Sequence, residues 1–285
     1  MNEMRPESIF DRSRRINLVG NLSVSGNAAK RIVSSTGAAE GFRGFSSKSN
    51  ARKFERLAKQ RSHVLVVQSG PVDGQVQTFL DWYLGRYLAI VEGVPACLEA
   101  RHYRRHPVDI TQGQCRPLPY DFLGLYQLSI DGAEEAESII ALIHAAHESE
   151  ETAHGVATWL YHPVSERVGS SPADQPSTLT IAFANPVEGR ETEFVEWYAT
   201  RHVRHALCHP MLLSGQCFAR SHAQHPGALD ASYRMIAIYE QEGAPEEFVA
   251  AGQAVPAERF DFPAMRWDRS TMACYEPLGQ SHAKR

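Results

Sequence analysis

Cysteine is scarce and irregularly spaced in this chain. Its five cysteines form an odd set with no C-x-x-C spacing, which argues against a disulfide framework and against a zinc ribbon. Long apolar runs are missing as well: no stretch approaches the roughly 18 to 20 apolar residues of a membrane helix, and the N-terminus lacks the apolar block of a secretory signal. We therefore expect reduced thiols, no membrane partner and a cytoplasmic protein.

Several motifs with well-known chemistry are also absent. The chain contains no glycine-rich phosphate loop, no G-x-S-x-G elbow and no dinucleotide fingerprint. It does contain enough apolar side chain for a sizeable buried core, because 43% of its 285 residues are hydrophobic and 22% are charged. The sequence therefore predicts a globular protein whose function depends on something other than these motifs.

The formal net charge of −4 is distributed unevenly. Residues 1–62 hold 13 Lys and Arg against 5 Asp and Glu, a net charge of +8, and the remainder holds 16 against 28, a net charge of −12. The acidic remainder argues against a nucleic-acid partner. The basic segment is rich in Ser, Gly, Asn and Arg, so it lacks the apolar surface needed to offset the entropy of ordering.

We expect the 1–62 extension to be mostly disordered, with a short helix over Ala51–Gln60. Four interpretations of it remain: an arm that packs on an acidic partner subunit, an extension without function, a nucleic-acid arm, or a mitochondrial-type presequence. Acidic residues at Glu3, Glu7 and Asp11 count against the presequence.

An internal repeat organises the rest of the chain. Gly70–Gly74 aligns with Asn185–Gly189 at a shift of 115 residues, and the alignment continues without a gap. Further on the shift becomes 113, where Tyr120 and Tyr126 align with Tyr233 and Tyr239. The ungapped matches are Pro71 with Pro186, Val72 with Val187, Gly74 with Gly189, Phe79 with Phe194, Trp82 with Trp197, Tyr83 with Tyr198, Arg86 with Arg201, Pro95 with Pro210, and Arg105 with Arg220. The series indicates a duplication.

Each copy has the pattern of six elements, β-α-β-β-α-β. A β-rich run and a Pro/Gly turn lead to a helix with apolar residues three and four apart, and two strands, an acidic-capped helix and a last strand follow. In the first copy the expected ranges are 63–69, a helix from 76, a strand after 95, 122–130, 133–146 and 156–162. In the second copy they are 178–184, a helix around 194, a strand after 210, 233–239, 245–254 and 265–275.

This pattern predicts an α+β fold of two tandem ferredoxin-like units. The helices should cover one face of each antiparallel sheet, and the uncovered faces should pack against each other to form an α/β-barrel. The predicted domains are the extension (1–62), the first unit (63–163), a Ser, Pro and Gly-rich linker (164–177), the second unit (178–276) and a tail (277–285).

Residues 185–202, with Pro210 and the strand ending at Arg220, resemble the EthD-type branch of the dimeric α/β-barrel superfamily. The resemblance extends over about 63–275 and is most specific over 183–220. It implies a barrel that holds its ligand in the lumen, here with both units in one chain. Members include cofactor-independent cyclases, isomerases, decarboxylases and dehydratases of aromatic or polyketide-like compounds, haem-dependent enzymes and many proteins without a known activity, so the fold alone does not determine the reaction.

The chain departs from the family's pattern at two places. Members commonly carry an Asp three residues after the helix His and a Pro-Gly after the helix, where this chain has His205 and Pro210-Met211. The first copy has Tyr87 where the second has His202. If the histidine is catalytic, only the second unit would supply it.

His202 is the leading candidate for a general acid/base. An imidazole titrates near neutrality and can remove a proton next to a carbonyl or donate one to a leaving hydroxyl, which is typically worth about 10²–10⁴-fold in rate. Tyr198, four residues earlier, should lie on the same side of the helix and donate to a developing oxyanion. Tyr87 occupies the equivalent place in the first unit. Alternatively, His202 is a helix-end histidine bonded to a backbone carbonyl and the aromatics are core packing.

Four more residues are candidates for substrate binding: Arg86, Arg201, Trp197 and His205. Arginine can hold a carboxylate or enolate with two hydrogen bonds. Because both arginines recur in the two copies, ion pairs with nearby acidic residues are the simpler interpretation for them, and packing is the simpler one for Trp197.

A metal or haem site is a further possibility. His202, His205 and His209 share one helix face, and His205 with His209 has the better spacing for one ion, since i to i+7 spans about 10 Å. The sequence thus predicts a cofactor-independent lyase or isomerase acting on a hydrophobic carbonyl compound. The alternatives are a non-catalytic small-molecule-binding or stress-related barrel, and a barrel enzyme that depends on a divalent metal or on haem. A homo-oligomer is compatible with each of these.

Overall fold

The computed structural model describes residues 62–170, 177–226, 233–253, 255, 264–279 and the backbone of 282–283. The extension at 1–61, including the expected helix over 51–60, therefore lies outside the described residues. Among the described residues, no helix is long and apolar enough to cross a membrane.

The first half follows the expected order of elements. It comprises β1 (Ser62–Pro71), α2 (Val76–Trp82), a π-helical turn η2 (Tyr83–Tyr87), α3 (Leu88–Gly93), β2 (Cys97–Arg105), β3 (Phe122–Ser129), α4 (Ala133–Glu148) and β4 (Ala153–Pro163). The strands form an antiparallel sheet in the order β4-β1-β3-β2, which is the ferredoxin-like arrangement.

The second half has the same strand order. It comprises β6 (Thr178–Ala184), α5 (Glu191–Trp197), a π-helical turn η3 (Tyr198–His202), α6 (Val203–Ala206), β7 (Leu212–Arg220), β8 (Met235–Gln241), a 3₁₀ turn η4 (Pro245–Glu247), α7 (Phe248–Gly252), a 3₁₀ turn η6 (Trp267–Arg269) and β9 (Thr271–Pro277). Its sheet runs β9-β6-β8-β7. The helix after β8 is shorter than its counterpart α4, which has 16 residues.

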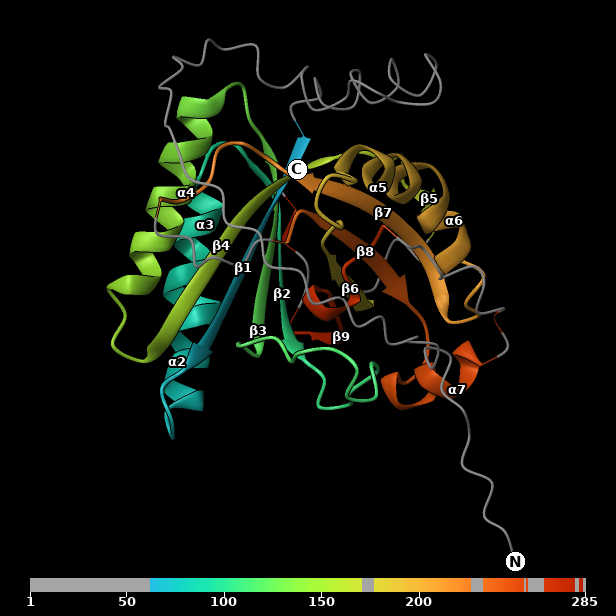
Figure 1. Cartoon of the computed structure of the whole chain (residues 1–285). Helices are drawn as coiled ribbons and strands as arrows, with labels where there is room; N and C mark the ends of the chain where they lie inside the picture. The colour runs from blue at the N-terminus through green and yellow to red at the C-terminus, as the bar shows by residue number, and fades with distance from the viewer. Residues whose placement is uncertain are drawn as a thin grey trace, which may run out of the picture.

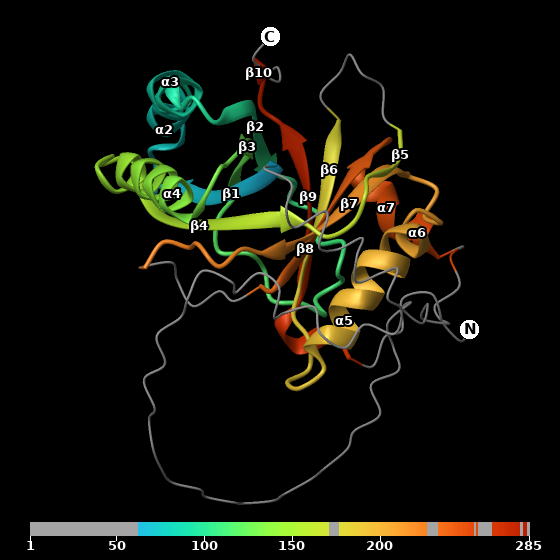
Figure 2. The same ribbon diagram turned by 90° about the horizontal axis from the view of Figure 1, so that it is seen from above.

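The two sheets join at their edges and close a barrel. β4 pairs with β7 through Tyr161 and Arg220, and β2 pairs with β9 through Arg105 and Tyr275, so eight antiparallel strands form a continuous ring. Figures 1 and 2 show α2, α3 and α4 outside one side of the ring and α5 and α6 outside the other. The α+β barrel predicted from the sequence is thus confirmed, although the sheets meet edge to edge rather than face to face.

Two short strands extend the seams of this ring along the edges of β7 and β2. β5 (Val168–Gly169), in the stretch expected to be a linker, pairs with β7, and β10 (His282–Ala283), in the expected tail, pairs with β2. Both segments therefore take part in the sheet.

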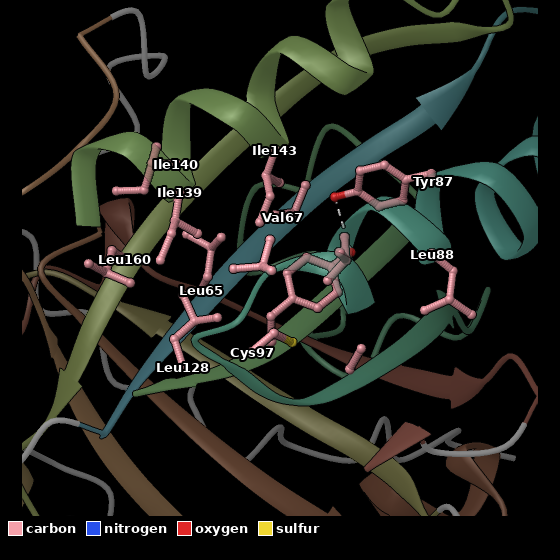
Figure 3. Close-up of a cluster of buried hydrophobic side chains, with 14 of the residues drawn as sticks. Leu65, Val67, Tyr87, Leu88, Cys97, Leu128, Ile139, Ile140, Ile143 and Leu160 are labelled. Carbon is pink, nitrogen blue, oxygen red and sulfur yellow. Dashed lines mark hydrogen bonds between the residues drawn. The ribbon is translucent and has the colours of Figure 1, made fainter. Parts of the chain in front are cut away.

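Side chains alternate between the two faces of each strand and build three buried clusters. In the first half, Leu65 and Val67 of β1 face Ile139 and Ile143 of α4 (Figure 3). A matching cluster lies between the helices and the sheet of the second half. The third cluster fills the barrel interior with large side chains that include Tyr103, Trp159, Tyr161, Phe183 and Tyr275. The interior is therefore densely packed with aromatic groups.

Candidate functional site

The two π-helical turns occupy equivalent places in the two halves. η2 covers Tyr83–Tyr87 and η3 covers Tyr198–His202, which corresponds to the repeat shift of 115 residues. Single π-helical turns within α-helices are frequently found at functional sites, because the extra residue redirects neighbouring side chains. Each turn begins with a buried tyrosine, and the second ends with the histidine singled out from the sequence.

His202 is surrounded by aromatic rings in the second half. Its imidazole stacks on Tyr198 with centroids 4.4 Å apart and an angle of 18°. Trp197 lies 4.9 Å away, and Tyr239 of β8 meets the ring edge-on at 6.3 Å. The predicted proximity of His202 and Tyr198 is therefore what the structure shows, and the first turn of η3 together with β8 builds the cluster.

The cluster lies on the outer, helix-covered side of the sheet. Tyr198 and Tyr239 belong to the buried cluster between helices and sheet, whereas the barrel interior is built by other side chains. The resemblance implies a ligand in the barrel lumen, but the rings that contact His202 lie outside the barrel. The reason is that successive side chains of a strand point to opposite faces of the sheet. In β8, Ala237 and Tyr239 face the helices, whereas Ile238 faces the lumen.

Three polar atoms of this cluster are buried without a hydrogen-bond partner: Nδ1 of His202 and the hydroxyl oxygens of Tyr198 and Tyr239. Buried polar atoms are nearly always paired, and leaving one unpaired costs about 1–3 kcal/mol. Tyr198 and Tyr239 are 1% and 2% exposed, while His202 is half-buried and reaches the surface. Unpaired buried polar atoms also occur in the first half, where the hydroxyl of Tyr83, the repeat equivalent of Tyr198, has no hydrogen-bond partner either.

Burial determines the protonation of these groups. Desolvation, with a smaller contribution from the neighbouring His205, lowers the pKa of His202 to about 3, so the ring is neutral at pH 7. Desolvation also raises the pKa of Tyr198 and of Tyr239 well above the ordinary phenol value, with nearby Cys217 adding to the shift. At neutral pH the cluster therefore presents two phenolic donors and one neutral imidazole.

The equivalent place in the first half differs in one hydrogen bond between tyrosines. The hydroxyl of Tyr126 donates to that of Tyr87 over 3.2 Å, and both rings are fully buried (Figure 3). His147 of α4 packs against Tyr87 at 4.1 Å, and Tyr83 stacks on it at 5.4 Å. Tyr87 thus belongs to a different buried cluster from His202, and the structure does not bring these two candidates together.

The candidate substrate-binding residues are dispersed. Arg86 and Arg201 are both exposed on their π-helical turns, outside the buried clusters. Trp197 is buried and forms one wall of the His202 cluster. His205 is half-buried and close enough to His202 to influence its pKa.

His209 has a structural role. Its Nε2 donates to the carbonyl oxygen of Phe248 at 2.9 Å, its Nδ1 accepts from the backbone N–H of Met211 at 3.2 Å, and the ring stacks on Phe248 at 4.0 Å. No lone pair remains for a metal ion shared with His205. Among the described residues, no group of three or more His, Cys, Asp and Glu side chains is placed to hold a metal.

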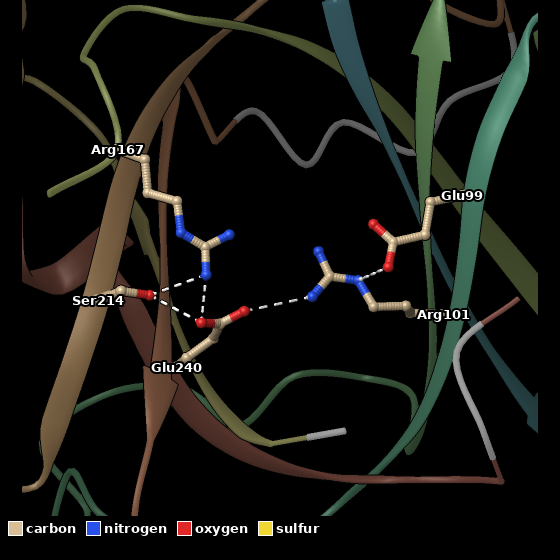
Figure 4. A network of polar contacts seen from close by, with 5 residues as sticks. All are labelled: Glu99, Arg101, Arg167, Ser214 and Glu240. Carbon is tan, nitrogen blue, oxygen red and sulfur yellow. Dashed lines mark hydrogen bonds and ion pairs between the residues drawn. The ribbon is translucent and has the colours of Figure 1, made fainter. Parts of the chain in front are cut away.

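An ion network that was not predicted from the sequence lies where the two halves meet (Figure 4). Glu240 of β8 forms ion pairs with Arg167 and, at 3.6 Å, with Arg101 of β2, and it accepts a hydrogen bond from Ser214 at 2.8 Å. Arg101 also pairs with Glu99 at 3.6 Å. The signal in the sequence was a glutamate that follows the apolar run 235–239 of strand β8. The charges balance within the network, which therefore ties β8 to β2 and to the segment before β6.

Tyr239 was not predicted as a site residue and is known from the sequence only as a repeat match. Its contact with His202 depends on β8 packing beneath η3. The fold and this cluster define a class: a closed α/β-barrel of two ferredoxin-like units, with a buried His and Tyr cluster outside the barrel of the second unit.

Comparisons with known proteins bear on the fold. No family model and no curated protein matches the chain. A solved structure of a monooxygenase candidate from Fusobacterium nucleatum subsp. nucleatum is similar at a TM-score of 0.52 and 6% identity, covering 78% of this chain and 94% of that one. At such identity the likeness shows a shared ferredoxin-like barrel fold.

Two further solved structures are more distant. An anthrone oxidase-like protein has a TM-score of 0.49 and 11% identity, covering 78% of this chain and 92% of its own. A chlorite dismutase mutant from Candidatus Nitrospira defluvii has a TM-score of 0.43 and 11% identity, covering 78% and 95%. Their TM-scores lie below 0.5, so neither adds to the assignment of the fold.

Proposed function

We propose that this protein is a cofactor-independent lyase or isomerase that acts on a hydrophobic, enolisable carbonyl compound, with His202 as the general base. The observation that carries the proposal is the unpaired, buried Nδ1 of His202 beside the unpaired hydroxyl of Tyr198. A neutral imidazole has the lone pair that a base requires, and the aromatic walls of Trp197 and Tyr239 suit a hydrophobic substrate.

The proposed step transfers a proton without any net oxidation. His202 Nδ1 takes the proton from the carbon next to the carbonyl, the C–H electron pair forms the C=C bond of an enolate, and the Tyr198 hydroxyl donates to the enolate oxygen. The imidazolium then returns the proton to another carbon, as in an isomerase, or to a leaving hydroxyl, as in a dehydratase. The enolate raises the pKa of the adjacent imidazole during the reaction, because opposite charges stabilise each other.

We further infer that the chain is a tandem duplicate of the EthD-type branch. The ungapped repeat, the shared strand order of the two halves and the equivalent π-helical turns support this ancestry. In this proposal the first half is the structural partner, because its Tyr87 is hydrogen-bonded to Tyr126.

Hydrogen–deuterium exchange of an enolisable aromatic ketone, 2-tetralone, in D₂O tests the proposal by NMR. His202→Gln should slow the protein-catalysed exchange about 10²-fold or more, since general-base catalysis is worth that much. Tyr126→Phe, in the first half, is the matched control and should leave the rate unchanged. Equal rates for wild type and His202→Gln in a folded protein contradict the role of His202.

The same samples separate the two alternatives. A non-catalytic binding barrel predicts that 2-tetralone binds but exchanges no faster than in buffer. A metal or haem enzyme predicts a bound ion on metal analysis or a Soret band in the absorption spectrum of the purified protein, with loss of that signal in His202→Gln.

A further inference from the structure

The two halves differ in how the tyrosine of their third strand lies. Tyr126 of β3 and Tyr239 of β8 are equivalent in the repeat, and both are fully or almost fully buried under a π-helical turn. Tyr126 is hydrogen-bonded to Tyr87, whereas the hydroxyl of Tyr239 has no partner. The difference needs a physical cause, because the two strands have the same place in the fold.

Two differences between the halves accompany it. The partner of Tyr126, Tyr87, is replaced by His202 in the second half, and one glycine has changed its position. In the first half, Gly124 precedes Tyr126 by two residues on the same strand, and a Cβ there would collide with the Tyr126 hydroxyl. In the second half, Gly215 is the cross-strand partner of Tyr239, and a Cβ there would collide with its ring. Each tyrosine therefore lies over the glycine that leaves room for it.

At these two equivalent positions of the repeat, glycine and alanine are exchanged between the halves: Gly124 corresponds to Ala237, and Ala100 corresponds to Gly215. Ala100 is the cross-strand partner of Tyr126, and Ala237 precedes Tyr239 by two residues on β8. Both alanines are buried on the helix-covered side of the sheet. The methyl group of Ala237 occupies the space into which Tyr239 would have to turn to lie as Tyr126 does, so Tyr239 is held across the sheet over Gly215.

We infer that Tyr239 is a second oxyanion-binding residue, which acts together with Tyr198 on the oxygen of an enolate or phenolate ligand. Two phenol hydroxyls that lack partners, on rings that both contact His202, can donate to one oxygen anion. In the second half, Gly215 and Ala237 hold Tyr239 where its hydroxyl is unpaired. In the first half, Gly124 and Ala100 allow Tyr126 to donate its hydroxyl to Tyr87 instead. This inference deepens the proposed function, on which its catalytic meaning rests.

The ligand class follows from the donors. Tyr198 and Tyr239 remain protonated at neutral pH, because burial raises the pKa of both phenols, so each carries a proton that it can donate to an anion. The charged side chains of the second half that are nearest in sequence, Arg201 and Arg204, are exposed. The site therefore suits a planar, delocalised oxyanion with an apolar body, better than a carboxylate or phosphate that would need a full positive charge.

Binding of 4-nitrophenol tests the inference, because ionisation of this probe changes its visible absorption and reports the bound oxyanion directly. The full-length wild-type protein should bind the probe as its phenolate. Tyr239→Phe should weaken this binding about tenfold to a hundredfold, the usual effect of removing one hydrogen bond to an anion. Tyr126→Phe is the matched control in the first half and should bind as wild type does.

The double variant Gly215→Ala with Ala237→Gly tests the cause. It should allow Tyr239 to lie as Tyr126 does and weaken phenolate binding as much as Tyr239→Phe, in a protein whose circular dichroism matches wild type. If this variant does not fold, the comparison of Tyr239→Phe with Tyr126→Phe still decides. Wild-type affinity in Tyr239→Phe, or no phenolate binding by the wild type, overturns the inference.

Failure of the proposed function gives a different result. If 4-nitrophenolate binding depends on Tyr239 while exchange of 2-tetralone does not depend on His202, the oxyanion site stands and the base assignment falls. If exchange of 2-tetralone depends on His202 but 4-nitrophenolate binding does not depend on Tyr239, His202 is the base and Tyr239 is a packing residue.

Discussion

The unpaired hydroxyls of Tyr198 and Tyr239 should make the protein less stable than it could be. Each hydroxyl is buried without a partner, on a ring that is otherwise well packed. Replacing either tyrosine by phenylalanine removes only the oxygen and keeps the ring in place. We therefore predict that Tyr198→Phe and Tyr239→Phe each stabilise the protein in the absence of ligand.

The magnitude follows from the cost of burying an unpaired polar group. That cost is about 1–3 kcal/mol from mutational data, so each variant should gain about 1–2 kcal/mol once small packing changes are allowed for. For a domain of this size, 1 kcal/mol corresponds to about 2–4 °C in Tm. Such a gain is the expected signature of side chains held for ligand binding rather than for stability.

The first half supplies the opposite case. Tyr126→Phe breaks the 3.2 Å hydrogen bond to Tyr87 and leaves the Tyr87 hydroxyl buried and unpaired. This variant should therefore lose about 1–2 kcal/mol. The same chemical change is thus predicted to have opposite signs at two equivalent positions of the repeat.

Urea unfolding followed by circular dichroism measures these differences, with the slope m checked for two-state behaviour. The wild type and all three variants should be measured without added ligand, since a bound molecule stabilises the folded state by an amount that grows with the ligand concentration. A loss of more than about 0.5 kcal/mol in both second-half variants would show that their hydroxyls are satisfied, for instance by an ordered water, and would refute the argument that the site is unpaired.

Two further predictions concern charge. His202, His147 and His162 have pKa values of about 3, 4 and 4 because burial disfavours the imidazolium, against about 6.5 in the unfolded chain. Their contribution to stability is complete above pH 6.5 and is lost as the pH falls from there toward 4 and 3. The free energy of unfolding in urea should therefore drop between pH 7.5 and 5.5 by about 1 kcal/mol per histidine. His202→Phe should reduce the drop, and a free energy of unfolding that does not change would contradict the burial argument. Glu240→Gln leaves the two arginines that it contacts without their shared carboxylate and should cost about 2 kcal/mol in the same assay, more than Glu99→Gln, whose side chain is more exposed; equal losses would show that the network is as weak as a surface ion pair.

Local patterns were sufficient to predict the elements of this fold. The helix stripe around Phe79 and Phe194, the Pro-x-x-Gly turns and the apolar strands are properties of neighbouring residues, and they reappear as the helices and strands of the structure. The ungapped repeat predicted that both halves would share one pattern. The closeness of Tyr198 and His202 followed from their spacing on one helix, and the structure shows the two rings stacked.

Long-range features were not predictable in this way. Which face of the sheet His202 would meet was not predictable, because it depends on which residues of β8 point outward when the barrel closes. The contact of Tyr239 with His202 joins segments about 40 residues apart, and the ion network of Glu240 joins β8 to Arg101 of β2. Only packing of complete elements brings such groups together.

Sequence by itself determined that this chain contains two similar α+β units and that only the second carries the histidine, because periodicity and residue identity are local. Only the tertiary structure decided that the histidine lies outside the barrel, that the hydroxyl of Tyr239 beside it is unpaired, and that Tyr126 donates to Tyr87 in the first half. The physical reason is steric: the space beside each tyrosine is set by a glycine or an alanine on a strand, and its effect appears only when strands are paired.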